Sequence, residues 1–298
     1  MKQAILIAAY KNFDHLIEII DFFNDDTFEI YLHIDKKTKL PKSVLGKLNT
    51  VSNLQLLSRR YIVNWGGTNQ LNCYLLLAEE ALKNRKNIYF HLISGQDYPV
   101  KSITEFKKLF ENPQKHDYLE NFELPRERWN NENGGFDRFL YYYFFDIFYS
   151  HKFKKAILFL VKIQKKLSIK RSFPKKIKTY YGGSSWWSLS KDTLQYVIDY
   201  TKENKYLLNR MKYTLASDEL YFQTVIMNSV YAKNVINDNL RYIDWNPERI
   251  GKYSPSPAIL DTSDFDKIIS SNKLFARKFD VPFSDELKHA ILKLQKGE

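Results

Sequence analysis

Two short runs of the sequence combine residue types that can do chemistry. The run SDE at 217–219 places two carboxylates side by side, and the run FARKF at 275–279 sets two cations between aromatic rings. A carboxylate that faces a cleft can act as a general base, but acids at the start of a helix also act as caps, so both roles stay open for SDE. Cations held between apolar neighbours in a partly dry site are suited to binding a diphosphate.

A third acidic run, DFD at 264–266, has the form of a motif that holds a divalent ion and a nucleotide diphosphate in many enzymes. Ser263 precedes it as a cap, and both acids fall in a first helical turn, where the helix dipole favours carboxylates. We therefore favour capping over metal binding. The six histidines show no paired spacing, and the glycine pairs at 66–67, 134–135 and 182–183 match no phosphate loop, so the sequence predicts no metal and no other cofactor.

The positive charge of the chain is concentrated in one segment. The 298 residues include 46 Lys and Arg against 34 Asp and Glu, a net charge of +12. Eleven of the basic residues and no acid lie within 151–178, so the rest of the chain is nearly neutral. This distribution argues against a nucleic-acid-binding protein, whose basic residues recur along a whole face.

Within this basic segment, residues 152–167 have the pattern of an amphipathic helix. Most apolar residues fall on one half of the helical wheel, and all six lysines fall on the other half with two further apolar residues. Such a helix can lie on an anionic membrane surface. The alternative is an ordinary surface helix whose lysines reach solvent above the core. Both interpretations stay open, and the first predicts peripheral membrane contact through 151–178.

Strand and helix signals alternate along the first third of the chain. Short apolar runs predict strands at 4–9, 29–34 and 87–93, and helical spacing predicts helices at 13–23 and 68–83, the latter with Thr68 as its cap. Alternation of this kind predicts a mostly parallel sheet covered by helices, with ligands at the carboxyl ends of its strands. Later elements are expected at 185–189, 191–201, 217–225, 240–245, 265–270 and 286–295.

The composition, 44% hydrophobic and 27% charged, is that of an ordinary globular protein. Cys73 is the only cysteine, so no intrachain disulfide forms. The first residues lack a small-residue cleavage site, and no apolar run approaches the roughly 18 residues of a membrane span. We therefore expect a cytoplasmic protein, with peripheral attachment to the inner face of the membrane if the basic helix binds lipid.

Six runs of the sequence together resemble the core-2/I-branching β-1,6-N-acetylglucosaminyltransferase family (glycosyltransferase family 14), which also contains peptide O-xylosyltransferases. In chain order they are VNWGG (63–67), HLISGQDYP (91–99), GGSSWWSLS (182–190), SDELYFQT (217–224), LRYIDW (240–245) and LFARKFD (274–280). The match extends from about Lys2 to Asp280, and the chain looks most like the compact bacterial members. Each run alone is weakly specific, whereas six in order are specific.

The resemblance implies an α/β fold of the GT-A type, with a mostly parallel central sheet flanked by helices. It implies one catalytic domain over 1–298. Within it, 1–135 would form the nucleotide-binding half, 136–181 an aromatic and basic helical segment, and 182–298 the acceptor side with the catalytic base and the diphosphate-binding part. The implied reaction is an inverting, metal-independent transfer from a UDP-sugar to a glycan hydroxyl. UDP-GlcNAc is the first candidate donor, UDP-xylose the second, and the glycan acceptor could be lipid-linked.

The resemblance also assigns roles around the leaving group. Glu219 falls on the position of the catalytic base, and Lys278 on a lysine that contacts the UDP diphosphate. A second basic residue of the animal enzymes falls near Pro255, which cannot bind a phosphate. Three further basic residues are therefore candidates to replace it: Arg277, Lys252 and Arg249.

The remaining implied roles concern uridine and the acceptor. Uridine-binding positions of the family fall on Ala8, Tyr10 and Asp35. Acceptor-binding positions fall on Glu120, Arg128, Trp129 and Trp245. The aromatic residue that follows the last of these by two positions in the animal enzymes is Pro247 here, which leaves the acceptor sugar open.

Two other classes of protein remain as alternatives. A non-catalytic module could bind an anionic surface or a nucleic acid through 151–178, although a pure binder has no reason to keep Glu219 together with Lys278. A glycoside hydrolase would need a second carboxyl close to the first, and no second motif supplies one. We therefore expect a UDP-sugar and a glycan as partners, and no nucleic acid.

Overall fold

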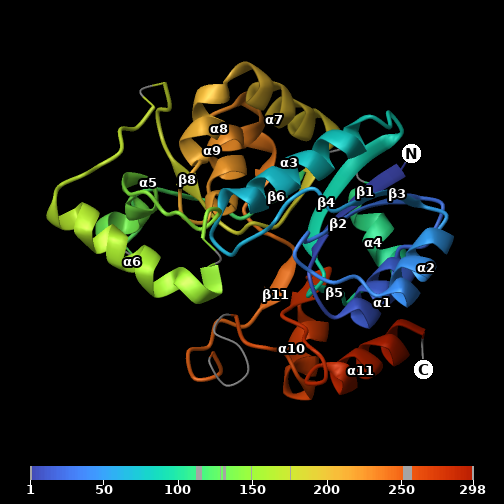
Figure 1. The fold of residues 1–298 in the computed structure, drawn as a ribbon. Helices are drawn as coiled ribbons and strands as arrows, with labels where there is room; N and C mark the ends of the chain where they lie inside the picture. Colours follow the sequence, from blue (N-terminus) through green and yellow to red (C-terminus); the bar gives the residue numbers. More distant parts are fainter. Residues whose placement is uncertain are drawn as a thin grey trace.

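The computed structural model describes residues 2–111, 116–127, 129, 132–148, 150–174, 176–250 and 257–296. Its centre is a seven-stranded sheet in the order β10-β6-β9-β4-β1-β2-β3 (Figure 1). The strands of this sheet are β1 (Lys2–Ala9), β2 (Phe28–Ile34), β3 (Leu54–Ser58), β4 (Asn87–Ser94), β6 (Asp117–Leu119), β9 (Trp187–Ser190) and β10 (Val235–Ile236). The three central strands β1, β2 and β4 are the three that the apolar runs predict.

Strands β1, β2, β3 and β4 pair in parallel, and β10 pairs in parallel with β6, whereas β9 is antiparallel to both of its neighbours. In the register of the parallel strands, Ile5 of β1 lies opposite Ile30 of β2 and His91 of β4. The carboxyl ends of β1, β2 and β4 therefore meet at one edge of the sheet, where chain order reverses from β2-β1 to β1-β4. Ligands bind open α/β sheets at such a point.

Successive side chains of β1 enter different cores because a strand alternates its side chains between the two faces of a sheet. Ile5 and Ile7 join the core on one face, while Ala4 and Leu6 join the core on the other. The first face is covered by α1 (Phe13–Phe22), α2 (Lys42–Thr50), α4 (Ile103–Phe110), α10 (Phe265–Ser270) and α11 (Asp285–Lys296). The second is covered by α3 (Thr68–Leu82), α7 (Lys191–Glu203), α8 (Lys205–Met211) and α9 (Tyr221–Met227).

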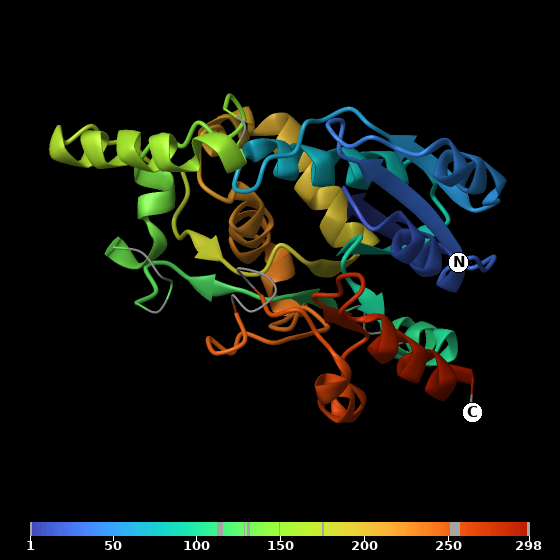
Figure 2. The same cartoon turned by 60° about the horizontal axis from the view of Figure 1, so that its bottom comes forward.

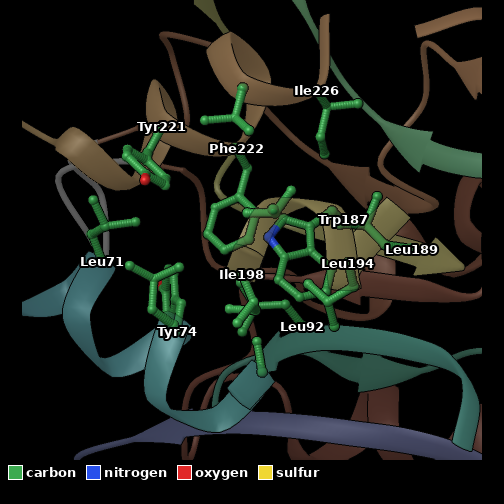
Figure 3. Close-up of a cluster of buried hydrophobic side chains, with 14 of the residues drawn as sticks. Leu71, Tyr74, Leu92, Trp187, Leu189, Leu194, Ile198, Tyr221, Phe222 and Ile226 are labelled. Carbon is green, nitrogen blue, oxygen red and sulfur yellow. The ribbon is translucent and has the colours of Figure 1, made fainter. Parts of the chain in front are cut away.

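The second core is built around a buried tryptophan. Trp187 of β9 lies with its ring centroid 5.0 Å from that of Phe222 of α9, and both are fully buried. Figure 3 shows α3 contributing Leu71 and Tyr74 to the same cluster. This three-layer arrangement confirms the predicted α/β fold with a mostly parallel central sheet flanked by helices.

Two smaller sheets lie beside the central one. One contains β11 (Arg241–Ile243), β12 (Phe275–Arg277) and β5 (Tyr98–Pro99), in that order, and the other pairs β7 (Phe122–Glu123) with β8 (Tyr181–Gly182). Four of the six family-like runs contribute strands to these two sheets. The small sheets therefore bring motifs distant in sequence against the edge of the central sheet.

The segment after residue 136 forms α5 (Asp137–Leu140) and α6 (Ser150–Lys166). In both Figure 1 and Figure 2, α6 lies at the periphery of the molecule, away from the central sheet. It packs on a separate small apolar cluster that includes Tyr141, Tyr143 and Phe145. The predicted helix at 152–167 is thus present. Among the described helices, none combines the length and the apolar composition needed to cross a bilayer.

Three local predictions need correction. Thr68 is not the cap of α3 but its first residue, since the helix begins after Gly67. Its first N–H groups are capped by the Asp146 carboxylate, which accepts from the backbone N–H of Thr68 at 2.7 Å. The residue that caps the turn before α10 is Asp261 rather than Ser263. The SDE run forms a single 3₁₀ turn, Ser217–Glu219, in which neither acid caps a helix, and α9 begins only at Tyr221. Elements that the sequence does not predict include helices α2, α4 and α8 and strands β3, β6, β10 and β12.

Candidate active site

The three predicted uridine-binding residues lie together where β1 and β2 end. The backbone N–H of Asp35 donates to the carbonyl of Ala9, next to Ala8, at 2.9 Å. Tyr10 is half exposed, and its hydroxyl donates to Oε1 of Gln96 beyond the end of β4 at 3.1 Å. The Asp35 carboxylate is buried and accepts from the backbone N–H of Lys37 at 3.0 Å, which fixes the loop after β2.

Cationic side chains gather beside these residues, at the end of β12. Lys278 is half-buried, and burial, Arg277 and Lys11 together lower its pKa to about 8. Lys11 itself pairs with Asp280 at 2.5 Å. With Arg241, which lies behind Arg277, four cations stand against two carboxylates, Asp280 and Asp97, and this excess of positive charge is suited to an incoming polyanion.

A buried ion cluster holds Arg277 in place. Its Nη1 donates to Ser94 Oγ at 3.0 Å and contacts Asp97 at 3.3 Å, while its guanidinium lies 4.5 Å from the ring centroid of Trp186. Asp97 also pairs with Nε of Arg241 at 3.2 Å, and both of these side chains are fully buried. Asp97 lies in the loop after β4, so this cluster joins the central sheet to β11 and β12.

The other two candidate diphosphate contacts differ from Arg277. Arg249 pairs with three carboxylates, those of Asp244 at 2.6 Å, Asp264 at 2.5 Å and Asp261 at 3.4 Å. Its bond to Asp264 is the main cause that raises the pKa of Arg249 above its usual range. This arrangement favours a structural role for Arg249. Lys252 lies outside the described residues.

The two acids of the SDE run have different surroundings. Asp218 is buried, and its Oδ2 accepts from Ser185 Oγ at 2.6 Å and from Gln70 Nε2 at 3.0 Å. Burial, and then the charge of Glu219, raise the pKa of Asp218 to about 7. The Glu219 side chain keeps 34% of its surface exposed. Glu219 is therefore the acid of the pair that can reach a substrate.

Glu219 has a partner that the sequence did not reveal. Nη1 of Arg138, on α5, pairs with Oε2 of Glu219 at 2.5 Å. The Arg138 guanidinium stacks 3.7 Å from the ring centroid of Trp129, a predicted acceptor-binding residue. Trp129 in turn contacts the edge of Phe122 in β7, with centroids 4.8 Å apart. A single arginine gives no local signal, since its partner is 81 residues away in sequence.

Glu120 and Trp245, two predicted acceptor-binding residues, line one pocket of about 250 Å³. Asn239 at its wall donates from Nδ2 to Oε2 of Glu120 at 2.7 Å. Burial is the main cause that raises the pKa of Glu120, and the nearby charge of Glu219 adds to it. Trp245 is 60% exposed. Arg128 lies outside the described residues.

Two glycines, Gly182 and Gly183, allow the chain segments that carry the candidate base and the predicted acceptor-binding residues to come close. The backbone N–H of Gly183 donates to the carbonyl of Glu219 at 3.0 Å, and a Cβ on Gly183 would lie 1.9 Å from the carbonyl oxygen of Glu120. A Cβ on Gly182 would lie 2.6 Å from the ring of Trp129. Only glycine permits this approach, so the GG of the third family-like run has a steric reason. Among the described residues, no group of three or more His, Cys, Asp or Glu side chains is arranged to hold a metal ion.

Residues 4–269 match the family model for the Core-2/I-Branching enzyme. The chain belongs to this family. Membership supports the GT-A type that the sequence predicts for the α/β fold, and it confirms the resemblance drawn from the six runs. The chain is thus a glycosyltransferase-family protein.

Its curated relatives include xylosyltransferases. The chain is 26% identical to xylosyltransferase 2 of Canis lupus familiaris over 274 residues, which cover 86% of this chain and 29% of the dog protein. It is 23% identical to xylosyltransferase sqv-6 of Caenorhabditis briggsae, over 84% of this chain and 31% of that protein. The chain therefore spans about 30% of the length of these relatives.

Solved structures with a more distant likeness include glycosyltransferases. Staphylococcus aureus TarS 1-349 matches with a TM-score of 0.39 and 11% identity, over 79% of this chain and 57% of that one. A glycosyltransferase involved in glycosylation of the major capsid of PBCV-1 matches with a TM-score of 0.35 and 10% identity, over 97% and 98% of the two chains. These scores are low, so the family assignment rests on the sequence match.

We predict that Asp97→Asn destabilises the protein by about 3–5 kcal/mol, because it leaves Arg241 buried without a full counter-charge. The free energy of unfolding from urea denaturation measures this effect. The matched control is Glu79→Gln, which removes a carboxylate from the exposed Lys202 pair and should cost about 0–1 kcal/mol. Equal effects of the two substitutions would contradict a special role for the buried cluster.

Proposed function

We propose that this chain transfers a sugar from a UDP-sugar to a hydroxyl of a glycan acceptor, with inversion at the anomeric carbon and without a metal ion. Glu219 is the proposed general base, and Lys278 with Arg277 is the proposed diphosphate site. The observation that carries the proposal is the environment of Glu219. It is the exposed acid of its pair, it lies near Glu120 of the acceptor pocket, and it is linked to the cation cluster through adjoining residues.

The link between base and cations runs through one short segment. Ser185 donates to Asp218, the neighbour of Glu219, and Trp186 lies beneath the guanidinium of Arg277. A base on one side and cations on the other is what an inverting transfer requires. The acceptor oxygen loses its proton to the base and bonds to the anomeric carbon as the carbon–oxygen bond to UDP breaks on the opposite face.

Arg138 acts in this proposal as a positioning residue. Among the described residues it alone bonds the Glu219 carboxylate, and it does so through Oε2. The other oxygen, Oε1, is then the one available to accept the proton. Stacking on Trp129 fixes the guanidinium and with it the direction of the carboxylate.

The developing negative charge on UDP is met by fixed cations in this proposal. The acidic DFD run supports that choice, because Asp264 is buried and already bound by Arg249 and by the backbone N–H of Asp261. Arg277 is held by the buried cluster, so its charge needs no reorganisation during the reaction.

Two donor sugars are candidates. The resemblance of the six runs makes UDP-GlcNAc the first candidate. UDP-xylose is the second candidate, and the names of the curated xylosyltransferases support it. Thermal-shift measurements with both nucleotides separate them: the true donor should stabilise the chain more than UDP alone.

We predict that Glu219→Gln lowers kcat by about 10²–10⁴ and leaves the affinity for UDP unchanged, because the amide cannot accept the acceptor proton. Steady-state transfer assays and calorimetry measure the two quantities. Asp218→Asn is the matched control. Its amide oxygen can replace Oδ2 as the acceptor for Ser185 and Gln70, so this variant should lose less than about tenfold in kcat. A Glu219→Gln enzyme that works at near wild-type rate would sink the assignment, as would an equal loss in both variants.

A second prediction concerns the pH dependence of UDP binding. The diphosphate binds the ammonium form of Lys278, whose pKa in the free protein is about 8. Affinity should therefore be level well below pH 8 and fall as pH rises through 8, by up to about tenfold per pH unit. Calorimetry from about pH 6.5 to about pH 9.5, a range that spans this pKa, tests the prediction.

The matched variants for this experiment are Lys278→Arg and Lys278→Met. Arginine stays charged, so the decline above pH 8 should vanish while affinity persists. Methionine removes the charge and should weaken binding at every pH. A decline that survives in Lys278→Arg would assign the titration to another group.

A third prediction concerns metal ions. Transfer should continue in excess EDTA at a rate within about twofold of the untreated protein, because lysine and arginine charges are not removed by a chelator. The assay is turnover before and after chelation. Loss of activity with EDTA and recovery with Mn²⁺ would refute the metal-independent part of the proposal.

A further inference from the structure

Helix α6 uses only a narrow stripe of its surface to pack on the protein. Ile157 and Val161 are buried on the small apolar cluster beneath it. Gln164 completes the stripe by exchanging hydrogen bonds with the backbone of Tyr142, accepting at 2.8 Å and donating at 3.0 Å. At about 100° per residue, the three residues of this stripe lie within about 60° of one another around the helix axis. Most of the helix circumference therefore faces solvent.

The exposed part of α6 is strongly apolar. Most of its exposed large apolar side chains lie within about 120° of the helix, next to the buried stripe, whereas Leu158 lies outside this sector, among the lysines. Phe153, Phe159, Leu160 and Ile163 are 37–62% exposed, as is Leu167 just past the helix at 63%. The patch continues onto Phe148, 40% exposed, whose ring lies 5.7 Å from that of Phe153. Isolated apolar residues on a surface are ordinary, but a contiguous patch of this kind marks an interaction site.

Lysines border this apolar face. Lys155, Lys162 and Lys166 follow it on the side away from the buried stripe, all exposed and without an acidic partner among the described residues. Lys165, in contrast, points toward the protein and pairs with Asp137 at 3.0 Å. No acid occurs anywhere in 151–178. An exposed apolar face edged by cations is the structure of a helix that lies in the headgroup region of an anionic bilayer.

We propose that α6 docks the protein on the surface of an anionic phospholipid bilayer, with Phe159 and Leu167 inserted below the headgroups and the flanking lysines bound to lipid phosphates. A nucleic acid would satisfy the lysines but leave the aliphatic side chains in water. The bilayer satisfies both, because its charge matches the lysines and its acyl boundary receives the apolar face. This inference does not depend on the sugar chemistry proposed above.

The docking surface is linked to the candidate base by a short path. Lys165 of α6 pairs with Asp137, and the next residue, Arg138, pairs with Glu219. Figures 1 and 2 show α6 along the outer edge of the molecule, with α5 beside it. Docking through α6 would therefore set the acceptor side of the site near the headgroups.

Sedimentation with vesicles tests the proposal. The full 298-residue chain is mixed with vesicles of phosphatidylcholine alone or with phosphatidylglycerol at roughly 30 mol %, a content that gives a strongly negative surface. We expect binding to the anionic vesicles, weak or no binding to the neutral ones, and a decrease in binding as salt rises. No binding to anionic vesicles at low salt would overturn the proposal.

Two sets of variants separate insertion from charge. Phe159→Ser with Leu167→Ser should weaken binding on the order of 100-fold, because both side chains lose apolar burial. The control Val230→Ser alters an apolar residue on another surface that is more exposed still, at 75%, and should have no effect. Since all three side chains face solvent, the variants should keep the wild-type Tm.

The charge variant replaces Lys155, Lys162 and Lys166 with Gln, and we expect a loss on the order of 100-fold. Its control replaces three exposed lysines on and before α2, Lys39, Lys42 and Lys47, with the same change in net charge and an expected loss below about threefold. Equal losses in the two sets would overturn docking through α6. So would a chain that ignores vesicles yet binds a DNA or RNA oligonucleotide through the same lysines.

Discussion

The structure depends on a buried ion cluster between the central sheet and the small sheet beside it. Asp97 follows β4, Arg241 belongs to β11 and Arg277 ends β12, and the three side chains meet against Trp186. A buried carboxylate is tolerated only when it is paired and hydrogen-bonded, and Asp97 has two guanidinium partners and the Ser94 N–H and hydroxyl. Removing any member would leave a buried charge, so the small sheet has one position relative to the central one.

The second constraint is the segment GGSSWW at 182–187, which connects the two halves of the candidate site. Its glycines let the backbone that carries Glu219 approach the backbone of Glu120, and its second serine, Ser185, donates to Asp218. Its first tryptophan supports the arginines, and its second lies in the core beside Phe222. Small residues thus bring the acids together while large ones anchor them, so base and cations are fixed by the same few residues.

The sequence was informative where a signal is local or a family pattern exists. The apolar runs of β1, β2 and β4 and the spacing of α1, α3 and α7 follow from burial, which leaves a periodic trace. The pairing of Arg138 with Glu219 and of Asp146 with the start of α3 left no trace, because each joins residues distant in the chain. The basic segment shows the limit most clearly. Periodicity identified an amphipathic helix, but only burial showed that most of its apolar face is not in the core.

The free site carries an electrostatic cost that a donor would relieve. Lys278 is half-buried near Arg277 and Lys11, and burial followed by these two charges lowers its pKa, which means that its charged form is disfavoured there. A diphosphate placed among these cations would reverse that penalty, so part of the repulsion present in the free protein returns as affinity. Asp280 limits the cost without cancelling it, because it is already engaged by Lys11 and Asn12. Fixed cations of this kind stabilise the folded protein less than neutral residues would, and the rigid cluster around Asp97 is what allows the fold to keep them.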